Sequence, residues 1–217
     1  MIYSLQNTFA QNYWCNAQSN KLMFLKKLIT SIVFSLLFSF QSCTNEKKVQ
    51  SYYEVIKSCE PVIVNDTIRS NFDCLDGAPI PEFSIIDING NTISNETMKG
   101  KLTLLNFWFI ECPPCIEEMP SLSRINDIFR GKNFNIISIC RNSRTELDEF
   151  LKDHSFPYRV AADGRTVLEE IFKNPFGYPS NVLVDEIGKI INVYHALIEE
   201  NKNTEYEVFI NEVRKNL

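Results

Sequence analysis

The feature that most constrains the fold is a long, nearly unalternated apolar run at residues 101–109, which leads directly into Cys-Pro-Pro-Cys at 112–115. A run of this kind is typical of a central strand that is covered on both faces. Apolar residues recur at helical spacing after the second cysteine, so we expect a helix from about 113 to 130 that stops at Gly131. A strand that leads into a cysteine pair at the start of a helix is the setting of a redox dithiol.

The rest of the main domain alternates strand-like and helix-like segments. Asn89-Gly90, between apolar segments 83–88 and 92–93, predicts a β-hairpin. Further strands are expected at 134–140, 158–161, 181–184 and 189–194, and further helices at 143–152, at 165–173 and after Thr204. This order predicts an α/β protein with a mixed central sheet flanked by helices.

The N-terminal residues form a predicted leader. Met23 opens a segment with two lysines, a short apolar stretch at 28–40 and a small residue before Cys43, which is the pattern of a signal peptide. Residues 1–22 fit no signal-peptide n-region and are interpreted as an upstream mis-start. Residues 44–74 are interpreted as a tether and an N-terminal extension.

Cys43 and the polar residues after it resemble the lipobox of bacterial lipoproteins. The resemblance implies that Cys43 is lipidated, becomes the mature N-terminus and anchors the protein to a membrane on the periplasmic side of the cell envelope. An uncleaved anchor and a conventionally cleaved, soluble protein are the alternatives. The net charge of −5, without a basic stripe, argues against nucleic acid as a partner.

Export changes how the remaining cysteines are interpreted, because thiols oxidise outside the cytosol unless they are actively reduced. Cys59 and Cys74 flank a short segment ahead of the main domain. They either form a disulfide that staples this segment or remain separate, half-buried thiols. Cys140 ends a predicted strand and is interpreted as a small buried hydrophobic residue.

Several short motifs together resemble the TlpA/ResA branch of the thioredoxin family over residues 75–217. They are Gly77-Ala78-Pro79-Ile80-Pro81-Glu82-Phe83, Gly100-Lys101, Asn106-Phe107-Trp108, the Cys-Pro-Pro-Cys sequence, Pro120, and Gly177-Tyr178-Pro179-Ser180 before a strand that ends in Asp185. The resemblance implies a thioredoxin fold with an N-terminal β-hairpin extension. It also implies that Pro179 is a cis proline facing the active-site sulfurs, and that Glu118 compensates for Asn106, which replaces the buried aspartate of ordinary thioredoxins.

The two cysteines of the pair are expected to have different roles. Cys112 lies at a helix N-terminus, where the helix dipole favours its thiolate, and is the predicted nucleophile. Cys115, one turn further on, is the predicted resolving thiol. Pro113 and Pro114 suit the first turn but have no N–H to donate to the thiolate, so we infer a less stabilised dithiol and a more reducing couple.

Periodicity separates the two glutamates of the predicted helix. Glu118 shares one stripe with Leu122 and Ile125, whereas Glu117 lies with Ser121 on the other side. Glu118 is therefore expected to point inward, where burial raises the pKa of its carboxyl and lets it accept the proton of the resolving thiol. A carboxylate that reaches solvent or pairs with a basic residue is the alternative.

Three further residues are expected around the dithiol. Trp108 is expected to pack beside it as core and as the edge of a substrate-facing surface. Tyr178 and Pro179 are expected to shape a groove in which backbone pairs with an extended segment of the partner protein.

The resulting interpretation is an exported thiol–disulfide oxidoreductase, monomeric and without a cofactor or metal, that reduces disulfides of envelope proteins. A membrane electron donor or a dithiol domain would re-reduce it. A metallochaperone or a thiol sensor of the same fold is the non-enzymatic alternative. A peroxiredoxin-like peroxidase is disfavoured because Phe109 occupies the position of the activating threonine, and a zinc site is disfavoured because His154 and His195 are isolated in the sequence.

Overall fold

The structure is a computed structural model that describes residues 50–59, 61–64, 67–70, 72–174, 176–199 and 204–217. The predicted upstream extension, the signal peptide and the lipidation site at Cys43 lie outside these residues. No helix in the described segments has both the length and the hydropathy that a membrane span requires.

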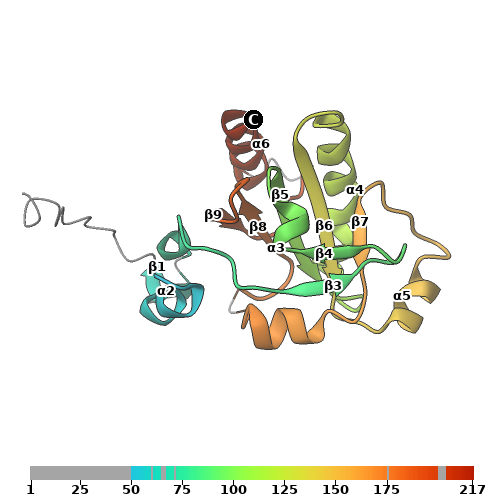
Figure 1. The fold of residues 1–217 in the computed structure, drawn as a ribbon, viewed down its shortest axis with the longest axis horizontal. Helices are drawn as coiled ribbons and strands as arrows, with labels where there is room; N and C mark the ends of the chain where they lie inside the picture. The colour runs from blue at the N-terminus through green and yellow to red at the C-terminus, as the bar shows by residue number, and fades with distance from the viewer. Residues whose placement is uncertain (1–49, 60, 65–66, 71, 175, 200–203) are drawn as a thin grey trace, which may run out of the picture. The chain divides into compact units, whose positions relative to one another are not determined.

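A five-stranded mixed sheet forms the centre of the fold, in the order β7-β6-β5-β8-β9 (Figure 1). Its members are β5 (Leu102–Trp108), β6 (Phe134–Cys140), β7 (Arg159–Ala161), β8 (Ser180–Val184) and β9 (Ile190–Tyr194). β5, β6 and β7 are parallel, and β8 and β9 add antiparallel strands on the other side of β5. All seven residues of β5 are buried, as a strand covered on both faces requires.

Each face of the sheet has its own hydrophobic core, because successive side chains of a strand point to opposite faces. On one face, α4 (Pro113–Ile128) and α6 (Thr204–Asn216) pack against Leu102 and Leu104 of β5. On the other, Leu105 and Phe107 pack against the hairpin and η2 (Thr166–Ile171), which is a π-helix. The apolar side of α4, which carries Leu122 and Ile125, is therefore the side that faces β5.

The predicted β-hairpin is confirmed in β3 (Ser84–Ile86) and β4 (Thr92–Ser94), which are followed by the short helix α3 (Asn95–Met98). Gly90 in its turn has φ +84°, which glycine adopts without steric cost. The buried carboxylate of Asp87 accepts hydrogen bonds from the backbone of Asn89 and Asn91 and pairs with Arg159 at 2.9 Å. These contacts fasten the turn to the edge of the central sheet.

The N-terminal extension has more structure than the sequence indicated. It contains α2 (Tyr52–Ser58), the antiparallel pair β1 (Pro61–Val64) and β2 (Thr67–Ser70), and η1 (Asp73–Leu75). A disulfide joins Cys59 to Cys74, which settles the pairing that the sequence left open.

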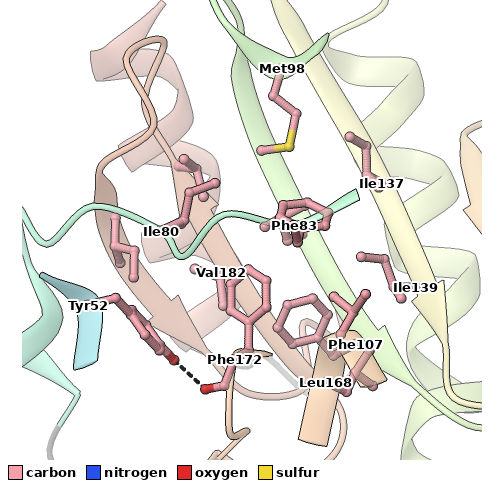
Figure 2. Close-up of a cluster of buried hydrophobic side chains, with 14 of the residues drawn as sticks. Tyr52, Ile80, Phe83, Met98, Phe107, Ile137, Ile139, Leu168, Phe172 and Val182 are labelled. Carbon is pink, nitrogen blue, oxygen red and sulfur yellow. Dashed lines mark hydrogen bonds between the residues drawn. The ribbon is translucent and has the colours of Figure 1, made fainter. Parts of the chain in front are cut away.

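Tyr52 anchors this extension in the main core, as Figure 2 shows. Its side chain is 2 % exposed, packs edge-on against Phe172, and donates a 2.7 Å hydrogen bond from its hydroxyl to the Phe172 carbonyl. The hydrophobic core therefore begins at residue 52, ahead of the boundary at 75 that the motifs indicated.

Most predicted elements of the main domain are confirmed, with differences at their ends. The predicted capping box of Ser143 and Glu146 opens α5 (Arg144–Phe150), which ends two residues earlier than expected. The predicted helix at 165–173 is present as the shorter η2. α3 is too short for a periodic pattern and was not predicted. The sequence also predicts a helix cap at Thr204, but the side chain of Thr204 lies outside what the structure describes.

Candidate active site

The cysteine pair lies just after the end of β5, at the start of α4. Cys112 is the N-cap of α4, and Pro113 and Pro114 occupy its first two positions, where a missing N–H breaks no helical hydrogen bond. Cys112 and Cys115 are joined by a disulfide with Cα atoms 5.3 Å apart. Both residues are buried, at 4 % and 2 % exposure. The structure therefore shows the oxidised form of the predicted dithiol.

Aromatic side chains surround this disulfide. Phe109 packs edge-on against Tyr178 at 5.1 Å between ring centroids, and Tyr178 contacts the cluster that contains both cysteines. The peptide bond between Tyr178 and Pro179 is cis, as the family resemblance implied. Tyr178 is partly exposed and Pro179 is buried.

The substrate-facing position expected for Trp108 is corrected by the structure. Its indole is 1 % exposed and packs against Phe150 and Phe156, with centroids 5.6 and 6.0 Å away. Trp108 points from the end of β5 into the cluster that includes α5, so it supports the dithiol from inside the protein.

Glu118 is fully buried, as the helical stripe predicted. Its Oε1 accepts hydrogen bonds from Nδ2 of Asn181 at 2.5 Å and from the backbone N–H of Leu197 at 2.6 Å. Its Oε2 accepts one from Nδ2 of Asn106 at 3.0 Å. Burial raises the pKa of the Glu118 carboxyl to about 8, and these hydrogen bonds offset only part of the rise.

Only part of the α4 stripe that was predicted to face outward is exposed. Glu117 is exposed, but Ser121, which was assigned to the same stripe, is 2 % exposed. The Ser121 hydroxyl accepts a hydrogen bond from the backbone of Glu199 at 3.1 Å. The segment after β9 covers this side of α4, which the helical pattern alone does not reveal.

Two residues of the Glu118 environment were missed at the sequence level. Ser138 and Asn181 flank Asn106 in one row across β6, β5 and β8, and all three are buried. Ser138 donates to Oδ1 of Asn106 at 2.8 Å, and Nδ2 of Asn106 donates to Oδ1 of Asn181 at 3.0 Å. Polar residues within otherwise apolar strands were the available signal, since such groups need partners when buried.

A polar pocket of about 460 Å³ opens next to the residues that precede Cys112. It is lined by Phe109, Glu111, Arg141, Asn142, Ser143, Glu146, Asp163 and Arg165. Arg141 pairs with Glu169 at 2.8 Å and lies over the Phe109 ring. This pocket brings charged side chains of both signs close to the dithiol end of the sheet.

The remaining candidate ligands and thiols are dispersed. Cys140 is a free, buried cysteine, and burial raises the pKa of its thiol to about 12, which disfavours a thiolate. His154 is exposed and stacks on Phe150, and His195 is exposed elsewhere. Within the described part of the chain, no three cysteine, histidine or acidic residues are grouped as a metal site would need.

Comparisons with known proteins identify the family of the chain. The redoxin family pattern matches residues 75–208. The thiol-disulfide oxidoreductase ResA of Bacillus cereus is 27% identical over 139 residues, 63% of this chain and 78% of that protein. The ResA of Bacillus subtilis (strain 168) is 28% identical over 146 residues, 66% of this chain and 80% of that protein.

A solved structure extends the comparison to the fold. The solution structure of a thiol:disulfide interchange protein from Bacteroides sp. has a TM-score of 0.52 and 29% sequence identity, and the match covers 63% of this chain and 90% of that one. The chain belongs to the redoxin family, within the TlpA/ResA-like branch of thioredoxin-fold proteins. Its activity is that of a thiol–disulfide oxidoreductase.

Proposed function

We propose that this protein is an exported, lipid-anchored reductase of envelope protein disulfides that works through Cys112 and Cys115. The observation that carries the proposal is the cysteine pair at the N-terminus of α4 with a buried carboxyl, Glu118, one turn beyond it. The leader sequence and Cys43 support export and anchoring.

The reaction begins from the reduced protein. The Cys112 thiolate attacks one sulfur of a substrate disulfide, which forms a mixed disulfide and releases the other substrate sulfur as a thiolate. Glu118 takes the proton of Cys115, and the Cys115 thiolate attacks the Cys112 sulfur. The bond between Cys112 and the substrate breaks, the second substrate thiolate leaves, and two electrons have passed to the substrate. The product is the disulfide form that the structure shows.

The cycle closes when a donor dithiol reduces this disulfide in the reverse sense, so the protein needs no cofactor of its own. Tyr178 packs against the cluster that contains both cysteines, and a cis peptide bond joins it to Pro179. These two residues are proposed to position an extended segment of the substrate. A Cys115→Ser variant expressed in cells should accumulate mixed disulfides with its substrates, because the resolving thiol is absent. Mass spectrometry identifies the partners, and recovery of no envelope protein would contradict the proposal.

The anchor is tested separately. Wild-type protein should sediment with membranes, and Cys43→Ala should move it to the soluble envelope fraction. A wild-type protein found wholly in the soluble envelope fraction would refute the lipid anchor and leave the redox proposal standing.

A further inference from the structure

The carboxylate of Glu118 is enclosed by hydrogen-bond donors. Nδ2 of Asn181, the N–H of Leu197 and Nδ2 of Asn106 all point at it. An amide nitrogen donates and does not accept, so none of these groups can receive a hydrogen bond from a protonated carboxyl. The donors therefore stabilise the charged form of Glu118 and offset part of the effect of burial on its pKa.

Partners on their far sides fix the two amides in this orientation. Oδ1 of Asn106 accepts from the Ser138 hydroxyl at 2.8 Å. Nδ2 of Asn181 also donates to the His195 carbonyl at 2.7 Å, and Oδ1 of Asn181 accepts from Asn106. Turning either amide over would place an oxygen against the carboxylate and break these bonds.

The sheet and the segment after β9 both supply donors to the carboxylate of Glu118. Ser138, Asn106 and Asn181 stand in register on three adjacent strands. The segment 195–199 closes over the carboxyl through the Leu197 N–H, and Glu199 ties it to α4 by pairing with Arg124 at 2.5 Å. Two of the three donors therefore lie on paired strands at the centre of the fold.

We propose that Asn181 and Asn106 are positioning residues that hold the buried Glu118 in place and stabilise its charged form against the cost of burial, so that a fraction of the carboxyl is ionised and can accept a proton near neutral pH. The proposal rests on the proposed function, in which that proton comes from Cys115. It assigns a purpose to two buried amides for which hydrophobic packing alone gives no reason.

Other charged groups around Glu118 act in different directions. Glu205 of α6 raises the pKa of Glu118 by charge repulsion. Tyr158, ahead of β7, is a neutral neighbour because burial and the charge of Glu118 raise the pKa of its hydroxyl. The Arg124 and Glu199 pair contributes both signs, and in the reduced protein the Cys112 thiolate adds a further negative charge. The amide donors are thus the contacts that lower the pKa of Glu118 and so oppose the effect of burial.

The test measures the protonation of Glu118 directly, by ¹³C NMR titration of its side-chain carboxyl in the oxidised protein. Asn181→Leu removes a donor and should raise the midpoint of the Glu118 titration by about one pH unit. At pH values below the midpoint, the ionised fraction of Glu118 should then be about tenfold smaller. Asn106→Ser, whose hydroxyl is too short to reach Glu118, should shift the midpoint in the same direction and serves if Asn181→Leu does not fold. A midpoint that does not move would overturn the proposal.

The pH–rate profile of mixed-disulfide resolution is the second readout. Both variants should be about tenfold slower near neutral pH and should recover toward the wild-type rate at higher pH. Equal loss at every pH would show a merely structural role and would also overturn the proposal. If Glu118→Gln leaves the wild-type profile unchanged, the proposed function fails instead, and the carboxyl titration still decides the role of the amides because it needs no turnover.

Discussion

The two disulfides in the described part of the chain have similar spans and different settings. Their Cα atoms are 5.6 Å apart in the bond between Cys59 and Cys74 and 5.3 Å apart in the bond between Cys112 and Cys115. The first joins residues 15 apart, at the end of α2 and within η1. The second joins residues three apart at the start of α4, with the buried Glu118 one turn beyond it.

These different surroundings lead us to propose different roles for the two disulfides. A bond that closes a longer loop restricts the unfolded chain more and so stabilises the fold. A bond between neighbouring residues on a helix N-terminus restricts little, but the helix dipole and a nearby proton acceptor favour its opening and closing. We therefore propose that the first bond stabilises the fold and that the second takes part in the reaction.

Cysteine substitutions should separate these roles with the largest effect. Cys112→Ser should abolish reduction of a disulfide substrate such as insulin, because the attacking thiolate is lost. The matched double variant Cys59→Ser with Cys74→Ser should keep turnover within about twofold at a temperature where it is folded. Loss of turnover in the folded double variant would mean that both bonds take part in the reaction.

The carboxyl beyond the dithiol gives the next largest effect. Glu118→Gln keeps the size of the side chain but removes the proton acceptor, so resolution of a mixed disulfide should slow by roughly 100-fold near neutral pH. Glu117→Gln on the exposed side of α4 is the control and should leave the rate unchanged. Stopped-flow kinetics with both variants checks this, and a slow Glu117→Gln variant would reassign the role.

The N-terminal disulfide should contribute mainly to stability. Replacing Cys59 and Cys74 together should lower the free energy of unfolding by about 3 kcal/mol, the value expected for a loop of this length. Urea denaturation of the oxidised proteins measures the difference. A change below about 0.5 kcal/mol would indicate that Tyr52 and its neighbours hold the extension without the bond.

Glu118 should also leave a signature in the pH dependence of stability. Its pKa rises from the ordinary 4.5 to about 8 on folding, so between these values the folded state binds more protons than the unfolded one. Wild-type stability should therefore fall as pH rises through this window, by up to about 1.4 kcal/mol per unit. Glu118→Gln has no carboxyl at this position and so lacks this pH-dependent contribution. Its free energy of unfolding relative to wild type should therefore increase from pH 5 to pH 8. A constant difference in urea denaturation would show that Glu118 is not shifted.

The smallest effect concerns the anchor of the extension. Tyr52→Phe keeps the buried ring but leaves the Phe172 carbonyl without this donor, so unfolding should become easier by about 1 kcal/mol. Tyr53→Phe, next along the chain and 38 % exposed, is the control and should change stability little. Equal effects of the two substitutions would mean that the hydroxyl of Tyr52 contributes nothing specific.

Local patterns predicted much of the reactive region. Spacings of a few residues predict the buried strand, the helix that starts after Cys112 and the inward orientation of Glu118. The hairpin followed from Asn89-Gly90 in the same way. These elements could be predicted because each depends on residues that are close in the sequence.

The polar row and the N-terminal anchor were not predicted, for different reasons. Asn181 meets Glu118 only because β8 pairs with β5 in one register, and single-sequence periodicity does not contain that information. Tyr52 enters the core through a contact with Phe172, 120 residues away. By contrast, α2 carried a readable signal, since Ser51 and Glu54 form a capping box, but the polar composition of the segment favoured a tether.

The most direct test equilibrates the intact protein in a series of thiol–disulfide buffers, alkylates the free thiols, and counts the label on each cysteine by mass spectrometry. The pair Cys112 and Cys115 should open reversibly, with a midpoint near the thioredoxin value of about −270 mV, since Pro113 and Pro114 offer the thiolate no N–H. Cys59 and Cys74 should stay oxidised at that potential, as structural disulfides do. Reduction of both bonds together, or of Cys59 and Cys74 first, would contradict the division between a reactive and a structural disulfide.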